Sequence, residues 1–284
     1  MGQQIVTENG RSLYVEDSPG TKGTIIAVHG LTGHHKQFMN YRKALAGTFR
    51  FISYDLPGRG NSGPALQDTS IFKHADDLTA LIYTLKIERP ILMGYSMGAY
   101  ICALAAANES IIPKALVLLD GAGEVDDTAR DLVLPSLDRM KKAYPSKDSY
   151  AMDMRSLYRK LNVNWTDRME DYVRYELARG SSSWRHKSDP ALIEKDFESF
   201  YAFEPADLQG LITCPVFLLI ATGSLAGNRS LFTEKSYEPV KRVFKELQVE
   251  KTSQNHYEIV LNNQPDLIER IKNFLTMEGI VHGH

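Results

Sequence analysis

Short, mostly apolar runs recur along the chain and are separated by longer segments of mixed polarity. Five such runs are Thr24–Val28, Phe49–Tyr54, Ile91–Met93, Ala115–Leu119 and Val216–Ile220. Apolar runs of this length, rich in Val, Ile and Leu, are typical of strands that are buried on both faces of a sheet. We therefore interpret them as the central strands of the protein.

The segments between the first strands have the spacing of helices. These segments are His35–Ala46, Ile71–Lys86 and Met97–Asn108. Alternation of strands and helices predicts an α/β fold with a mostly parallel sheet that is covered by helices on both faces. Near the start, Asn9-Gly10 separates two short apolar runs, and this pattern predicts a hairpin with a tight turn.

The alternation stops between residues 124 and 210. This segment is rich in charged and aromatic residues and contains no run that resembles a buried strand. Ala151–Leu161 and Met169–Arg179 have the pattern of amphipathic helices. We expect 124–210 to form a helical cap that is inserted into a sheet domain made of 1–123 and 211–284.

Composition narrows the class of protein. The chain has 284 residues, 43% of them hydrophobic, and its 33 Lys+Arg against 35 Asp+Glu give a net charge of -2. This balance disfavours nucleic acid as a partner. The apolar runs are too short to span a bilayer, and the first residues do not resemble a signal peptide. Two cysteines, Cys102 and Cys214, cannot form a disulfide framework or a four-cysteine zinc site. We expect a cytoplasmic protein that acts on a small molecule.

The segment Gly94-Tyr95-Ser96-Met97-Gly98 is the strongest chemical motif. It follows a predicted strand and precedes a predicted helix, which is the setting of the nucleophile elbow. Ser96 would sit on a strained turn, and side chains at Gly94 or Gly98 would collide with the neighbouring strand and helix. We expect Ser96 to be a nucleophile at a helix N-terminus, where backbone N–H groups favour developing negative charge.

A second loop follows the strand that ends at Val28. It reads His29-Gly30-Leu31-Thr32-Gly33. The Leu31 N–H can point to the same oxygen as the Met97 N–H, and the pair would form an oxyanion hole. We expect His29 to hold this loop by hydrogen bonds and not to act as a base.

Two other clusters have polar residues that suggest chemistry. His34 and His35 are adjacent, so their side chains should point in different directions, and no third ligand is near in the sequence; we expect no metal site. Asp55 and Arg59 lie in a loop rich in Pro and Gly, and we expect them to fix that loop.

Taken together, these motifs resemble the α/β-hydrolase superfamily over nearly the whole length of the chain. The resemblance implies a serine hydrolase without cofactor or metal, with a cap after the sixth strand. It also implies a catalytic histidine after the last strand. His256, in Asn255-His256-Tyr257 before the predicted helix at Pro265, matches that position. It would take the Ser96 proton and return it to the leaving group.

The acid of the triad departs from the family pattern. The family usually places it shortly after the next-to-last strand, and the matching loop, with Ala226 near the expected position, has no carboxylate. A variant in the superfamily carries the acid at the end of the sixth strand, where this chain has Asp120. Asp120 is our expectation. Glu124, Asp126 or no acid at all are the alternatives.

The expected function is cleavage of a carboxylic ester or thioester of a small, apolar substrate through an acyl-enzyme on Ser96. Relatives of this architecture also include carbon–carbon bond hydrolases, cofactor-free dioxygenases and haloperoxidase-like enzymes, and fold alone does not separate them. A ligand-binding relative without activity is a further alternative. The cap aromatics are expected to pack the cap and in part to line a pocket: Tyr144, Tyr150, Tyr158, Trp165, Tyr172, Tyr175, Trp184, Phe197, Phe200 and Phe203.

Overall fold

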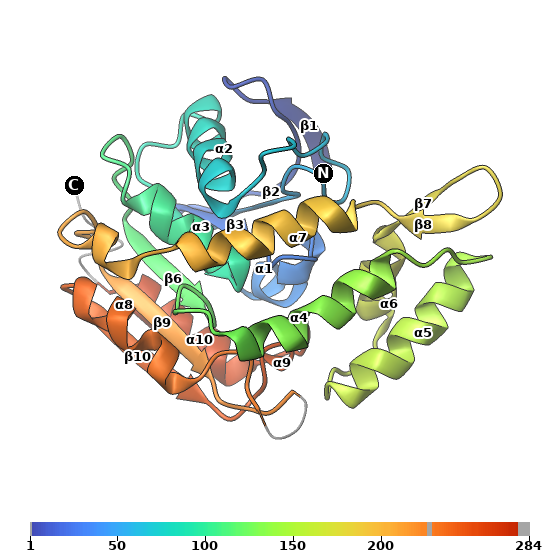
Figure 1. Cartoon of the computed structure of the whole chain (residues 1–284). Helices are drawn as coiled ribbons and strands as arrows, with labels where there is room; N and C mark the ends of the chain where they lie inside the picture. The colour runs from blue at the N-terminus through green and yellow to red at the C-terminus, as the bar shows by residue number, and fades with distance from the viewer. Residues whose placement is uncertain (1, 226–228, 278–284) are drawn as a thin grey trace.

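A twisted eight-stranded sheet forms the centre of the computed structural model, which describes residues 2–225 and 229–277 (Figure 1). Its strands are β1 (Gly2–Val6), β2 (Ser12–Ser18), β3 (Thr24–Val28), β4 (Arg50–Tyr54), β5 (Ile91–Tyr95), β6 (Ala115–Leu119), β9 (Val216–Ala221) and β10 (Leu247–Thr252). They lie in the order β1-β2-β4-β3-β5-β6-β9-β10. The pairs β1–β2 and β2–β4 are antiparallel, and the other pairs are parallel. The predicted mostly parallel sheet is confirmed.

Helices cover both faces of this sheet. They are η1 (His35–Phe38), α1 (Met39–Leu45), α2 (Ile71–Thr84), α3 (Met97–Ala106), η4 (Glu234–Tyr237), α8 (Glu238–Val243), α9 (Glu258–Leu261) and α10 (Pro265–Leu275). Along β3, Ile26 and Val28 belong to the core that contains α2 and α3. Ile25 and Ala27 belong to the core that contains α1 and α10. Because alternate residues of β3 enter two different cores, all its positions from Ile25 to Val28 are apolar.

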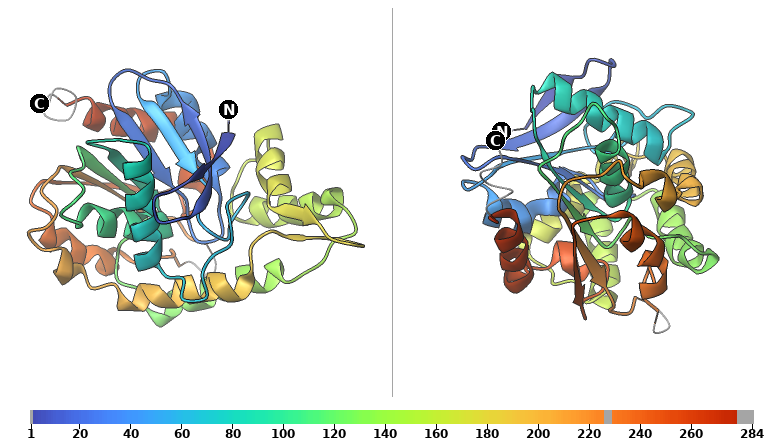
Figure 2. Two further views of the ribbon diagram at one scale, coloured as in Figure 1. Left: turned by 90° about the horizontal axis from the view of Figure 1, so that it is seen from above. Right: turned by 90° about the vertical axis from the view of Figure 1, so that its left-hand side faces the viewer.

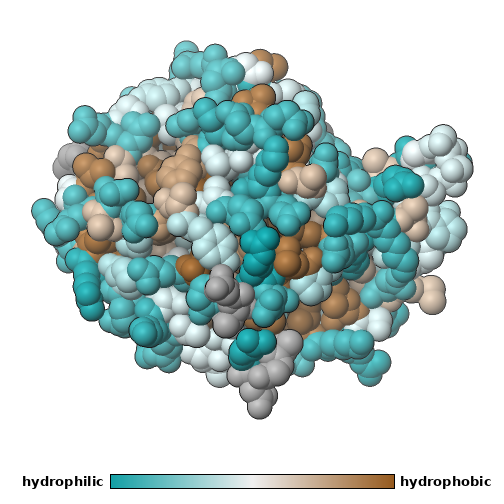
Figure 3. Space-filling view, viewed as in Figure 1, coloured by the Kyte–Doolittle hydropathy of each residue, from teal (hydrophilic) through white to brown (hydrophobic). Residues whose placement is uncertain are grey.

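The chain between β6 and β9 forms a largely helical unit. It contains α4 (Asp127–Met140), α5 (Lys147–Lys160), α6 (Asp167–Tyr175), α7 (Pro190–Glu198), η2 (Ser199–Ala202) and η3 (Pro205–Leu208). Seen from above, α5 and α6 project beside the sheet (Figure 2). Apolar side chains gather on the surface around α4 and α7 (Figure 3). None of the described helices is both long and apolar enough to pass through a membrane.

The predicted C-terminal end of one helix in this unit is wrong. Met169–Arg179 was expected to be helical, but α6 ends at Tyr175, and Leu177–Arg179 forms β7 instead. β7 pairs antiparallel with β8 (Trp184–His186), and Trp184 also bridges Tyr144. The hairpin, together with the bridge from Trp184 to Tyr144, overrides the helical spacing of the sequence. The small sheet is separate from the central one.

A buried ionic cluster joins the cap to the sheet domain. Asp196 of α7 is fully buried, and its Oδ2 lies 2.6 Å from Nη2 of Arg59 and 3.1 Å from Nε2 of His74. Its Oδ1 accepts a hydrogen bond of 2.7 Å from the Thr69 hydroxyl. Burial raises the pKa of Asp196, but Arg59 and His74 outweigh it and hold that pKa well below its usual range. The Arg59 guanidinium also donates to the Leu31 carbonyl, at 3.2 Å from Nη2. The cap is thus linked through Arg59 to the loop that contains Leu31.

Loss of the Asp196 charge should destabilise the protein. Asp196→Asn leaves the Arg59 guanidinium buried without its counter-ion, and breaking such a pair from one side costs about 3 kcal/mol or more. Urea unfolding should show this decrease, whereas Asp131→Asn, at an exposed position of α4, should stay within about 0.5 kcal/mol of the wild type. Equal stabilities of the two variants would show that the cluster does not stabilise the fold.

Candidate active site

Ser96 lies on a strained turn between β5 and α3. Its φ is +54°, in the left-handed region that few residues other than glycine adopt. A Cβ at Gly94 would lie 2.1 Å from the Gly98 carbonyl oxygen, and a Cβ at Gly98 would lie 1.9 Å from the Val28 carbonyl oxygen. Both contacts are far below van der Waals distance. The two glycines are therefore required because α3 packs directly against the sheet at this turn.

Asp120 and His256 meet at the carboxyl ends of the parallel strands. Asp120 directly follows β6, is fully buried, and has a positive φ of 47°. Its Oδ2 lies 2.7 Å from Nδ1 of His256. Its Oδ1 accepts hydrogen bonds from the Tyr237 hydroxyl at 2.7 Å and from the Ala221 N–H at 3.0 Å. Both carboxylate oxygens are thus satisfied, and one of them orients the imidazole.

The alternatives for the acid lie elsewhere. Glu124 and Asp126 are exposed, and Asp126 Oδ1 accepts from the Ala129 N–H at 3.1 Å at the start of α4. Ala226, the position at which the family pattern expects the acid, lies outside the described residues. Among the candidates with described side chains, Asp120 is the one in contact with His256.

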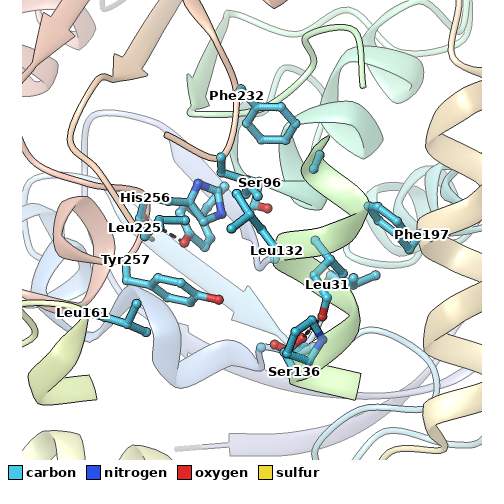
Figure 4. Close-up of a pocket in the computed structure, with 18 of the residues that line it drawn as sticks. Leu31, Ser96, Leu132, Ser136, Leu161, Phe197, Leu225, Phe232, His256 and Tyr257 are labelled. Carbon is cyan, nitrogen blue, oxygen red and sulfur yellow. Dashed lines mark hydrogen bonds between the residues drawn. The ribbon is translucent and has the colours of Figure 1, made fainter. Parts of the chain in front are cut away.

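His256 is fixed by its neighbours as well as by Asp120. The Tyr95 hydroxyl donates to the His256 carbonyl at 2.9 Å, and the two rings lie 4.8 Å apart between centroids. Ser96 and His256 both line one cavity (Figure 4). Because Nδ1 is held by Asp120, Nε2 is the nitrogen left for Ser96. No hydrogen bond joins the two side chains in the structure, and contacts of this kind often tighten only when substrate is bound.

The loop after β3 leaves backbone donors free at the cavity that Ser96 lines. The Gly30 N–H donates to Oε1 of Gln37 at 2.9 Å, and the Gly33 N–H donates to the Gly30 carbonyl at 3.0 Å. The N–H groups of Leu31 and Thr32 between them have no acceptor among the described residues. Met97 is the first residue of α3, where N–H groups lack partners within the helix. The Leu31 and Met97 amides are the donors that the sequence predicts for an oxyanion.

His29 is part of the framework of this loop. It is fully buried, and burial lowers its pKa to about 3. The neutral ring is therefore the relevant form. Nδ1 donates to the Gly30 carbonyl at 2.8 Å, and Nε2 accepts from the Leu56 N–H at 3.0 Å. Both ring nitrogens are used, as expected for a histidine that holds two loops together.

One premise about the histidine pair is wrong. His34 and His35 were expected to lack a third ligand, but Asp55 comes close enough for one ligand atom of each residue to lie within 4.8 Å of the others. The protein already occupies these atoms: His35 Nδ1 lies 2.7 Å from Asp55 Oδ1, and His35 Nε2 lies 3.2 Å from Glu16 Oε2. Asp55 Oδ2 accepts from the Tyr175 hydroxyl of α6 at 2.6 Å. The cluster therefore has the chemistry of a hydrogen-bonded link between sheet domain and cap.

The cavity around Ser96 has a volume of about 320 Å³ and lies between the sheet domain and the cap. Three of the cap aromatics singled out from the sequence line it, namely Tyr158, Phe197 and Phe200. Tyr144 and Tyr172 are instead packed in the core. Sequence reasoning missed the α4 residues of the lining: Ala129, Leu132, Val133, Pro135, Ser136 and Arg139. Their spacing of three and four residues was a signal for one helix face.

Comparisons with known proteins agree with the architecture. Residues 23–222 match the family model described as the alpha/beta hydrolase fold. The AB hydrolase superfamily protein YisY of Bacillus subtilis (strain 168) is 40% identical over 124 residues, 43% of this chain and 46% of that protein. The first curated relatives are thus matched over less than half of their own length.

Two solved structures match nearly the whole chain. The crystal structure of E-2-(acetamidomethylene)succinate hydrolase has a TM-score of 0.82 at 18% identity, covering 98% of this chain and 99% of that one. The N-formylmaleamic acid deformylase of Pseudomonas putida S16 has a TM-score of 0.72 at 21% identity, covering 96% of this chain and 100% of that one. At these identities the likeness shows the fold.

The close approach at the elbow should make Gly98 intolerant of substitution. In Gly98→Ala the new Cβ meets the Val28 carbonyl, so the turn must shift, at a cost of about 3 kcal/mol, the upper end of ordinary overpacking. Gly180→Ala is the control, because its Cβ would lie 3.2 Å from the Ser183 carbonyl in the β7–β8 turn. Denaturant unfolding of both variants measures the difference. A Gly98→Ala protein as stable as Gly180→Ala would contradict this geometry.

Proposed function

Because the chain belongs to the α/β-hydrolase fold family, we propose that it is a serine hydrolase. Its substrate is a small, largely apolar carboxylic ester or thioester, and the reaction passes through an acyl-enzyme on Ser96. The hydrolase and deformylase named among the structural neighbours support hydrolysis as the reaction class.

The contact between Asp120 and His256 is the observation that carries this proposal. A histidine that serves as a base for serine needs a partner at Nδ1, so that Nε2 is free to accept the serine proton. Asp120 supplies that partner at 2.7 Å from a site without solvent access. Ser96 lines the cavity that His256 also lines. These are the roles of nucleophile, base and orienting acid, each on a different strand end.

In the first half of the reaction, the Ser96 oxygen attacks the acyl carbon and its proton passes to Nε2 of His256. The Leu31 and Met97 N–H groups stabilise the negative charge that develops on the acyl oxygen. The bond to the alcohol or thiol then breaks, and that leaving group takes the proton from Nε2. Asp120 stays ionised and stabilises the transient imidazolium through Nδ1–H.

In the second half of the reaction, water takes the place of Ser96 as the nucleophile and hydrolyses the acyl-enzyme. His256 takes a proton from water as its oxygen attacks the acyl carbon, and the proton then returns to Ser96 as the acid is released. The same two amides stabilise the second oxyanion. Free acid and alcohol or thiol are the products, and the enzyme needs no metal or cofactor for this cycle.

Removal of the nucleophile should abolish turnover. Ser96→Ala deletes the attacking oxygen, so kcat for short-chain 4-nitrophenyl esters should fall by several orders of magnitude. Ser110→Ala, at an exposed position, is the control and should keep wild-type kcat. If Ser96→Ala keeps more than about a tenth of the activity, His256 and Asp120 act without a serine nucleophile, as a base in another chemistry of this fold.

Replacement of Asp120 should change activity more than stability. In Asp120→Asn the carbonyl oxygen can still accept from Tyr237 and Ala221, but the amide donates to His256 Nδ1 and selects the wrong tautomer. We expect kcat to fall by about 10³–10⁴. Steady-state kinetics measure the loss, and thermal unfolding checks that the variant is folded. A decrease below about tenfold in a folded variant would remove Asp120 from the mechanism.

A further inference from the structure

One arginine lies in a cavity that is otherwise largely apolar. Arg139 lines the same cavity as Ser96 and His256, and it is the one permanently charged side chain among the described lining residues. No carboxylate is found in that described lining. The Arg139 Nε is buried and has no hydrogen-bond partner in the described part of the chain. The Arg139 side chain as a whole is only partly exposed, and a cation in such a place without a counter-ion is unfavourable, so its position requires an explanation.

Helix geometry places Arg139 on the cavity face of α4. Leu132, Ser136 and Arg139 follow one another at helical spacings of four and three residues, so they share one face. Figure 4 shows Leu132 and Ser136 at the cavity that contains Ser96. Arg139 also lies in the last turn of α4, where backbone carbonyls favour a cation. This effect stabilises the charge but leaves the buried Nε–H without an acceptor.

Glu176 is the acidic group that acts on Arg139 electrostatically, but no ion pair joins the two. Glu176 accepts its hydrogen bond from the Tyr150 hydroxyl. Burial raises the pKa of Glu176 to about 7, and the hydrogen bond from Tyr150 and the charge of Arg139 oppose this only in part. Near neutral pH, Glu176 therefore carries only part of a negative charge. Burial also opposes the charge of Arg139, but Tyr158, Tyr150 and Glu176 raise its pKa, so the guanidinium remains a cation.

We propose that Arg139 binds a carboxylate of the substrate, so that the preferred substrate is a small ester with one free carboxylate and an apolar linker. A carboxylate matches the planar fork of a guanidinium and accepts two hydrogen bonds from it. Its single negative charge neutralises a single cation, whereas a phosphate dianion would leave one charge uncompensated among apolar residues. This inference rests on the proposed cleavage of esters at Ser96 and adds the substrate class.

Half-esters of dicarboxylic acids test this preference. Monoethyl succinate, glutarate and adipate carry a carboxylate at increasing distances from the same ethyl ester, and the corresponding diethyl esters lack it. The wild type should cleave the best half-ester with kcat/KM at least tenfold above that of its diester. Arg139→Met, which keeps the length of the side chain, should lower kcat/KM for that half-ester by 30-fold or more. Its kcat/KM for the diester should stay within threefold of the wild type.

Arg155→Met is the matched control, since Arg155 is exposed on α5 and does not belong to the described lining. It should keep the wild-type preference for the half-ester. Thermal unfolding of Arg139→Met should occur at or above the wild-type temperature, because an unpaired buried charge is removed. If the ratio of half-ester to diester activity is the same in Arg139→Met as in the wild type, or if the wild type prefers the diester, the carboxylate subsite is refuted.

Measuring the affinity for half-esters tests the role of Arg139 independently of ester cleavage. In a Ser96→Ala background, calorimetric titration with the half-esters measures affinity without turnover, and adding Arg139→Met should weaken it at least tenfold. If the wild type cleaves no ester but binding depends on Arg139, the subsite stands and ester cleavage fails. If esters are cleaved while binding and specificity are indifferent to Arg139, ester cleavage stands and the subsite fails.

Discussion

A fully buried carboxylate at the end of β6 organises the candidate active site. Asp120 is surrounded by protein, and such a charge is stable only if its oxygens are hydrogen-bonded. The Tyr237 hydroxyl, the Ala221 N–H and the His256 ring meet this requirement from three separate segments that follow β6 in the chain. The hydrogen bonds that stabilise the buried carboxylate therefore also hold the His256 imidazole in place, in the cavity that Ser96 lines. The contact that neutralises the buried charge of Asp120 is thus the same contact that would orient His256 for catalysis.

The oxyanion loop is coupled to the cap by a second buried charge cluster. Arg59 donates to the Leu31 carbonyl and pairs with Asp196 of α7. The peptide that presents the Leu31 N–H is thus positioned through an ion pair that reaches into the cap. Arg139, on another helix of the cap, lines the same cavity as Leu31. The cap therefore contributes to the proposed chemistry in two ways. It supports the loop that presents the Leu31 N–H, and it forms part of the wall of the substrate cavity.

The sheet and the elbow could be predicted because their signals are local. Apart from Thr24 at the start of the first, the runs Thr24–Val28 and Ala115–Leu119 are apolar throughout because both faces are buried, and their predicted bounds are those of β3 and β6. Glycines at 94 and 98 indicate a close approach of helix and sheet. The role of Tyr237 could not be predicted, because it depends on a contact with Asp120, a residue far away in the chain. β7 was missed for a different reason: its partner β8 lies only a few residues further along the chain, but the residue pattern up to Arg179 resembled that of an amphipathic helix.

Covalent labelling shows whether Ser96 is a nucleophile activated by His256 and Asp120. The protein is treated with an aryl alkylphosphonate that transfers its phosphonyl group to activated serines, and intact mass and peptide mapping locate the adduct. We expect one adduct per chain on Ser96, which forms rapidly in the wild type and far more slowly when His256 or Asp120 is replaced. A wild-type protein that gains no adduct, or gains it at another residue, would contradict the assignment of Ser96, His256 and Asp120 as a catalytic unit.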